Sequence, residues 1–66
     1  MMDLVKFGKH WEIETRADYD RAMEALEGAD FCARMSDDYA TERREREEVA
    51  RQMAEVVRTA KQKGLI

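Results

Sequence analysis

The chain contains no proline, one cysteine and one histidine in 66 residues, and each shortage excludes a class of protein. Because Cys32 has no second cysteine to pair with, an internal disulfide framework is excluded. Zinc sites need several Cys, His or carboxylate ligands at short spacings, and His10 and Cys32 stand far apart in the sequence. We therefore expect no metal and no other cofactor.

Residues for catalysis are equally sparse. A nucleophilic Cys32 would need a base, and His10 is the one histidine available. Cys32 lies on an apolar helical stripe, which favours a small core side chain. Asp37 and Asp38 are adjacent, so on a helix they project about 100° apart and form no acid/base pair. With no Gly-rich phosphate loop and no nucleophile elbow, we expect a protein that is not an enzyme.

Long hydrophobic runs are also missing. The longest uncharged apolar stretch near the N-terminus is the pair Leu4 and Val5, which is too short for a secretory signal. No segment approaches the roughly 18 apolar residues of a membrane span. We expect a soluble, cytoplasmic protein whose thiol stays reduced.

Charged side chains are abundant, at 41% of the chain, but their signs nearly balance to a net charge of -3. Residues 1–40 carry five Lys/Arg and ten Asp/Glu, whereas residues 41–66 carry seven and five. Neither segment has the clearly basic character of a nucleic-acid-binding domain, so we do not expect a nucleic-acid partner. A chain this short is marginally stable alone, which favours oligomerisation.

Residues 4–14 alternate in polarity, with Val5, Phe7, Trp11 and Ile13 sharing one parity. Alternation of this kind predicts a β element. The sequence leaves three forms open: a single strand, a hairpin with a three-residue loop at 8–10, or a ribbon paired with a second chain.

Two helices follow. Thr15 and Asp18 resemble a capping box, which predicts a helix over residues 16–27 that ends at Gly28. A longer helix is predicted over 30–63, either continuous or slightly kinked near Ser36, with a stop at Gly64. The expected fold is mainly α: residues 1–66 form one domain, a helical hairpin with a short N-terminal β element.

The long helix carries a stripe at alternating steps of three and four, as coiled-coil core positions do. Its members are Cys32, Met35, Tyr39, Glu42, Arg46, Val49, Met53, Val56 and Ala60. We interpret this stripe as the contact surface of a homo-oligomer, a homodimer or larger. The predicted interface residues are Tyr39, Val49, Met53, Val56 and Ala60, together with the aromatic Trp11.

The function predicted from these features is a protein-interaction module that acts by binding another protein. By analogy with other small acidic helical proteins, it would be a mobile-element accessory factor or an inhibitor that covers a nucleic-acid-binding surface. The sequence does not indicate which protein it binds.

A second hypothesis rests on the order strand, helix, Gly-x-Asp turn and helix over residues 4–48. This order resembles the ribbon-helix-helix dimers, whose paired strands enter the major groove. The resemblance implies that Lys6, Gly8, His10 and Glu12, followed by Glu14, face the DNA. The two carboxylates, those of Glu12 and Glu14, would then oppose the phosphates.

The phrase IETRADYDRAMEAL, residues 13–26, resembles the segment that opens some HigA-type antitoxins. No functional residue is carried over from that resemblance. An antitoxin role is compatible with binding to another protein.

Overall fold

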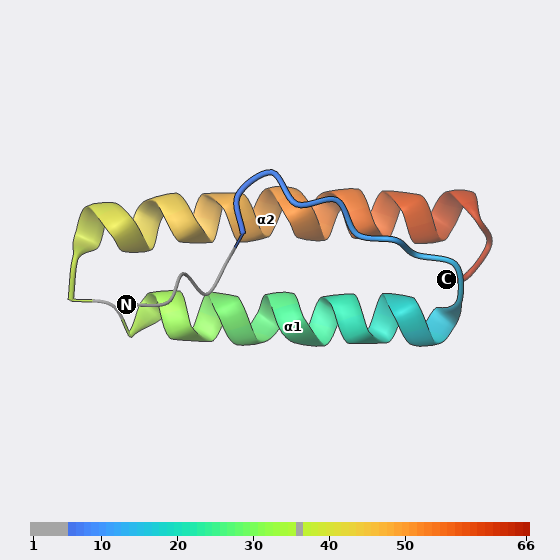
Figure 1. Ribbon diagram of the computed structural model, residues 1–66, viewed down its shortest axis with the longest axis horizontal. Coiled ribbons are helices and arrows are strands. Elements are labelled where there is room, and N and C mark those ends of the chain that lie inside the picture. Colours follow the sequence, from blue (N-terminus) through green and yellow to red (C-terminus); the bar gives the residue numbers. More distant parts are fainter. Residues whose placement is uncertain (1–5, 36) are drawn as a thin grey trace.

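The computed structural model describes residues 6–35 and 37–66, and its backbone is a helical hairpin (Figure 1). Helix α1 spans Arg16–Arg34 and helix α2 spans Tyr39–Gln62. The two helices lie side by side and run in opposite directions. The predicted helical hairpin is confirmed. Neither helix combines the length and apolar character that crossing a membrane requires.

Helix α1 begins with the capping box predicted from the sequence. The Thr15 hydroxyl accepts a hydrogen bond from the Asp18 backbone N–H at 3.2 Å. The Asp18 carboxylate accepts hydrogen bonds from the backbone N–H groups of Thr15 and Glu14, both at 3.1 Å. These hydrogen bonds, led by the one from Glu14, lower the pKa of Asp18. Because the cap satisfies free donors at the helix start, it fixes where α1 begins.

The predicted end of this helix at Gly28 is wrong. Helix α1 continues through Gly28 to Arg34, because the residues beyond it extend the buried face with Ala29 and Ala33. A glycine inside a helix is unfavourable by about 1 kcal/mol relative to alanine. Burial of the two alanines against α2 offsets that cost.

The predicted continuous helix over 30–63 is also corrected. The chain reverses between Arg34 and Tyr39, so the expected kink near residue 36 is a complete break between two helices. Asp38 caps α2 by accepting hydrogen bonds from the Ala40 backbone N–H at 3.1 Å and the Thr41 hydroxyl at 2.6 Å. Gly64, with a φ of 72°, follows the C-cap Lys63 as predicted.

Small side chains dominate the interior between the helices. Among the described residues, the buried apolar side chains are Ile13, Ala22, Leu26, Ala29, Ala33, Val49, Val56 and Ala60. Trp11, Tyr19, Met23, Met53 and Leu65 pack partly buried around them. The alanines of α1 allow the helices to approach closely, but each buries little apolar area.

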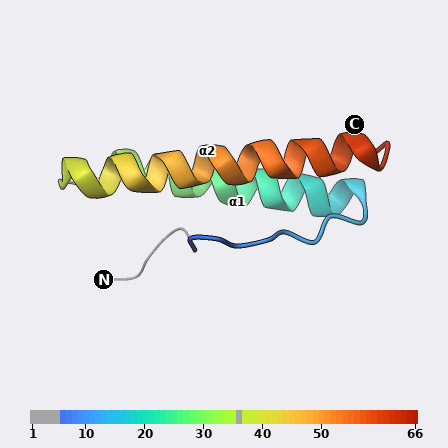
Figure 2. The same ribbon diagram turned by 90° about the horizontal axis from the view of Figure 1, so that it is seen from above.

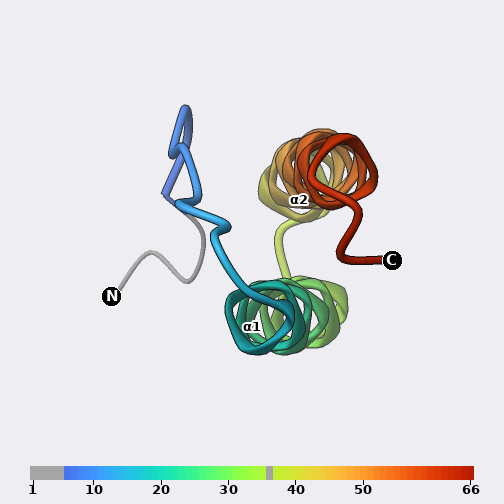
Figure 3. The same cartoon turned by 90° about the vertical axis from the view of Figure 1, so that its right-hand side faces the viewer.

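Residues 6–14, here named the N-terminal strap, run back from α1 along one side of the hairpin (Figures 2 and 3). The predicted β element is wrong for these residues: they form neither a strand nor a β-hairpin. The Lys9 N–H bonds the Lys6 carbonyl in a turn, with Gly8 at a φ of 76°, and this turn breaks the alternation. Trp11 and Ile13 still face the helices, whereas Val5 lies outside the described residues.

Replacing Gly28 and Gly64 by alanine separates the two roles of glycine in this fold. Gly28→Ala should raise the free energy of unfolding by about 1 kcal/mol, because Gly28 lies inside α1 with open space around its Cα. Gly64→Ala should lower it by about 1–2 kcal/mol, because Gly64 has a φ of 72°. Urea unfolding followed by circular dichroism measures both. If Gly28→Ala instead lowers the free energy of unfolding, the result indicates that α1 ends at Gly28.

Candidate functional site

The strap is attached to α2 mainly through the side-chain amide of Gln52, which is 1% exposed. Its Oε1 accepts a hydrogen bond from the Trp11 indole Nε1 at 2.8 Å. Its Nε2 donates to the Lys6 carbonyl at 2.7 Å and to Glu48 Oε2 at 2.6 Å. Because Trp Nε1 only donates and the other two groups only accept, these partners fix the orientation of the amide. Gln52 thus holds the strap at its first residue, Lys6, and at Trp11.

Glu48 extends this network one helical turn earlier. Its carboxylate accepts the Gly8 backbone N–H at 2.9 Å, and Arg51 donates to both of its oxygens at 2.7 and 2.9 Å. The hydrogen bonds from Arg51 and then Gln52 lower the pKa of Glu48 to about 2. The ionised carboxylate therefore contributes to strap attachment.

Two further contacts hold the strap along its length. The Nδ1 of His10 lies 3.0 Å from Glu55 Oε1, at an exposed position. The Nζ of Lys63 donates to the Ile13 carbonyl at 2.6 Å, beyond the end of α2. The strap thus contacts α2 from Glu48 to the C-cap.

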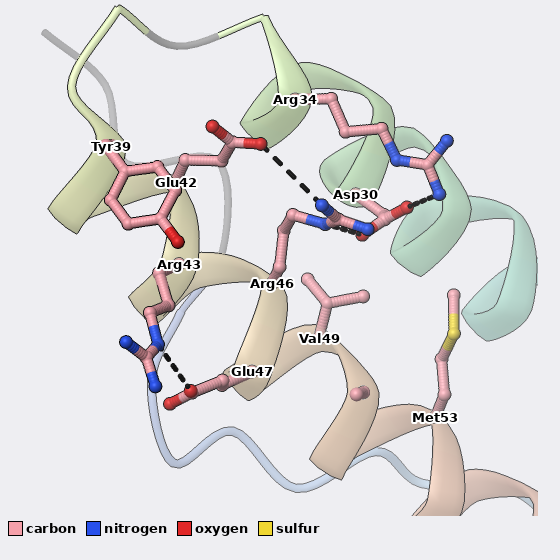
Figure 4. A pocket seen from close by; sticks show the side chains of 10 residues that line it. Asp30, Arg34, Tyr39, Glu42, Arg43, Arg46, Glu47, Val49 and Met53 are labelled. Atoms are coloured by element: carbon pink, nitrogen blue, oxygen red, sulfur yellow. Dashed lines mark hydrogen bonds and ion pairs between the residues drawn. The ribbon is translucent and has the colours of Figure 1, made fainter.

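The opposite side of α2 borders a groove of about 440 Å³ near the turn of the hairpin (Figure 4). Asp30 of α1 lines this groove and pairs with Arg34 at 3.0 Å and with Arg46 at 3.4 Å. Arg46 also reaches Glu42 at 3.6 Å, so an ion-pair network joins the two helices. Val49 and Met53 line the groove below this network.

Three large apolar side chains stand exposed at the same end of the hairpin. Phe31 is 64% exposed, Met35 is 71% exposed and Tyr39 is 75% exposed. Phe31 and Met35 are four residues apart at the end of α1, and Tyr39 is the first residue of α2 and lines the groove. We name Phe31, Met35 and Tyr39 the turn patch. Their exposure leaves them free to contact a partner molecule.

The residues predicted to form an interface fall into three groups in the structure. Val49, Val56 and Ala60 are buried inside the hairpin. Met53 and Trp11 are partly buried, and Tyr39 is exposed. The apolar stripe of the long helix thus packs mainly against α1 of the same chain. Contact of these residues with a second chain stays a prediction.

Sequence reasoning missed the two residues that hold the strap, Gln52 and Glu48. A glutamine in a charged helix gives no signal of burial, although it falls at helical spacing with Val49 and Val56. It also missed the exposure of Phe31, because Phe31 was expected to belong to a second helix.

The described residues contain no group of three His, Cys, Asp or Glu side chains that could hold a metal ion. The one free thiol, that of Cys32, is exposed, so the interpretation of Cys32 as a core side chain is wrong. Comparisons of the chain with protein-family models, with curated proteins and with solved structures find no match. The functional argument therefore rests on the chain itself.

An isosteric change at Gln52 tests the attachment of the strap. In Gln52→Glu the donor amine becomes an oxygen that faces the Lys6 carbonyl and the Glu48 carboxylate. Leaving these partly buried groups unsatisfied should lower the free energy of unfolding by about 1–3 kcal/mol. Trp11 is the one tryptophan, so its fluorescence reports release of the strap during urea unfolding.

The matched control is Gln62→Glu, at the exposed last residue of α2. A new carboxylate there faces the negative end of the helix and should be destabilising by at most about 1 kcal/mol. If Gln52→Glu and Gln62→Glu lower the free energy of unfolding by the same amount, the role given to Gln52 is contradicted.

The lowered pKa of Glu48 predicts sensitivity to acid. A carboxylate whose pKa falls from 4.5 in the unfolded chain to about 2 in the fold stabilises the fold above pH 4.5. That contribution is lost as the pH falls toward 2. The free energy of unfolding should therefore fall between about pH 5 and about pH 2, and Glu48→Gln should reduce the fall by about 1–3 kcal/mol. If the free energy of unfolding falls by the same amount in the unaltered chain and in Glu48→Gln, the prediction is contradicted.

Proposed function

We propose that the chain is a non-enzymatic interaction module that binds another protein through the turn patch. The observation that supports this proposal is the gathering of Phe31, Met35 and Tyr39 at one end of the hairpin, each more than 60% exposed. Aromatic side chains and methionine are enriched at the centres of protein interfaces. Their burial by a partner removes apolar area from water, which stabilises a complex.

Charged groups next to the turn patch favour a protein over a nucleic acid. Arg34, Arg43 and Arg46 are each paired with a carboxylate of the same chain. Binding to phosphates depends on cations that neutralise the phosphate charge, and these arginines already have acidic partners. An apolar centre with a paired, polar rim is instead the usual anatomy of a protein interface.

The ribbon-helix-helix hypothesis needs residues 4–14 as a strand that pairs with a second chain. Residues 6–14 are held on α2 by Gln52 and Glu48, and no strand occurs among them. No observation favours DNA binding, so we do not propose it as a second function.

Replacing Phe31 tests the proposed binding surface. The immobilised chain and its Phe31→Glu variant are used to capture proteins from cell extract, and the affinity of each captured protein is then measured with purified components. Phe31→Glu should weaken binding of the partner at least about tenfold, because it places a charge in an apolar contact. The fold should persist, because Phe31 is exposed.

The matched control is Phe7→Glu, which changes another exposed phenylalanine, at the strap. This variant should bind the partner as the unaltered chain does. Equal binding by Phe31→Glu and the unaltered chain, or loss of binding in Phe7→Glu alone, would contradict the proposal.

A further inference from the structure

The negative charge of the chain gathers at the turn end of the hairpin. Residues 24–47, which lie on both sides of the turn, carry eight Asp/Glu and four Lys/Arg. The rest of the chain carries seven Asp/Glu and eight Lys/Arg, so the excess of acidic residues belongs to the turn end. Because the turn patch lies at this end, a partner that binds the turn patch meets acidic surroundings.

Some carboxylates at this end are exposed and form no ion pair or hydrogen bond with the residues that the structure describes. They are the side chains of Glu24, Glu27 and Asp37. The neighbouring cations Arg34, Arg43 and Arg46 are paired with other carboxylates. A partner with cationic side chains would therefore meet carboxylates that the fold itself leaves without a counter-charge.

Two of these carboxylates lie in line with the turn patch on the outer side of α1. Glu24, Glu27, Phe31 and Met35 follow one another at steps of three and four, so they share one side of the helix. All four are exposed, and the buried residues of α1 lie on the opposite side of the helix. The four side chains, here named the docking row, extend about 16 Å along α1.

Gly28 leaves a gap within the docking row. Gly28 lies inside α1 without a positive φ, and apart from the backbone of its own helix nothing lies within 4 Å of where a Cβ would stand. The fold therefore does not require glycine at this position, and alanine would be the more favourable residue in the helix. A glycine on an exposed face allows the backbone of another molecule to approach closely. The gap beside Phe31 thus suits contact with a partner.

We infer that the docking row binds a basic segment of another protein, whose apolar side chain contacts Phe31 and Met35 while Lys or Arg meets Glu24 and Glu27. This partner chemistry rests on the proposed function of the turn patch. Opposite charges across an interface speed association and fix its orientation, whereas like charges repel. The same carboxylates repel the phosphates of a nucleic acid, and they repel each other if two copies of the docking row are brought together.

The test uses two synthetic helical peptides that share one leucine face and carry either lysine or glutamate at all other positions. Fluorescence anisotropy of each labelled peptide with the full chain, at low and high salt, gives the affinities. The lysine peptide should bind at least about tenfold tighter than the glutamate peptide at low salt, and this difference should shrink as salt screens the charges. Equal affinities, or tighter binding of the glutamate peptide, would overturn the inference.

Neutralising the docking row separates local charge from net charge. The double variant Glu24→Gln/Glu27→Gln should weaken binding of the lysine peptide about tenfold at low salt. Its matched control, Glu12→Gln/Glu14→Gln, removes the same charge at two exposed positions of the strap and should change the affinity less than about twofold. Equal weakening in the two double variants would assign binding to net charge and overturn the inference.

Filling the gap tests the close approach of the partner. Gly28→Gln adds an uncharged side chain that favours the helix, so the free energy of unfolding should rise while the lysine peptide binds at least about threefold more weakly. A merely structural role of Gly28 would not move stability and affinity in opposite directions. An unchanged affinity in Gly28→Gln would overturn the proposed contact.

Phe31→Gln distinguishes failure of this inference from failure of the proposed function, because it removes the apolar anchor without adding charge. Weaker binding in Phe31→Gln but not in Glu24→Gln/Glu27→Gln would refute the basic partner and leave the turn patch as a binding surface. Unchanged binding in Phe31→Gln would contradict the turn patch itself. Sedimentation of the chain alone covers the other occupant: a dimer that is lost in Phe31→Gln would assign the docking row to a second copy and overturn the inference.

Discussion

The buried amide of Gln52 is the contact on which one side of this molecule depends. The described strap residues have no neighbouring strand, so their backbone groups are paired by side chains of the helical segment or hydrated by water. One glutamine does so for Lys6 and orients Trp11, and Glu48 does so for Gly8. A buried polar group with all its partners present fixes one arrangement, because any other leaves a donor or acceptor unsatisfied. The strap therefore has one defined register on α2, and through Ile13 it adds one of the larger side chains of the core.

Small side chains determine how stability is distributed over the rest of the fold. The interior face of α1 presents three alanines and a single leucine, which limits the hydrophobic contribution of helix packing. The cap at Thr15 and the network at Glu48 then each carry a sizeable share. In a chain with one cysteine and no described metal cluster, these are the available means of stabilising a short hairpin.

The helix ends that were predicted correctly depend on residues close in sequence. The features that were not predicted depend on contacts between residues far apart in sequence. The start of α1 followed from Thr15 and Asp18, and the end of α2 followed from Gly64, because caps depend on residues close in sequence. Gly28 misled the prediction because burial of Ala29 and Ala33 outweighs its weak helix propensity. Alternation indicated correctly that Trp11 and Ile13 point inward, but it was wrong for Phe7, which is exposed. It also did not indicate that helices rather than a strand would receive these side chains. The groove could not be predicted, because it depends on Asp30 and Arg46, which are brought together only by the turn.

The turn patch also bears on how such a protein can change over evolutionary time. Phe31, Met35 and Tyr39 are absent from the buried core, so substitution at these positions leaves the packing of the hairpin largely untouched. Under the proposed function, selection can therefore act on the binding specificity of this surface almost independently of selection on folding. A scaffold that binds through such a surface can follow a rapidly diverging target, or acquire a new one, by changes at a few positions around a single turn.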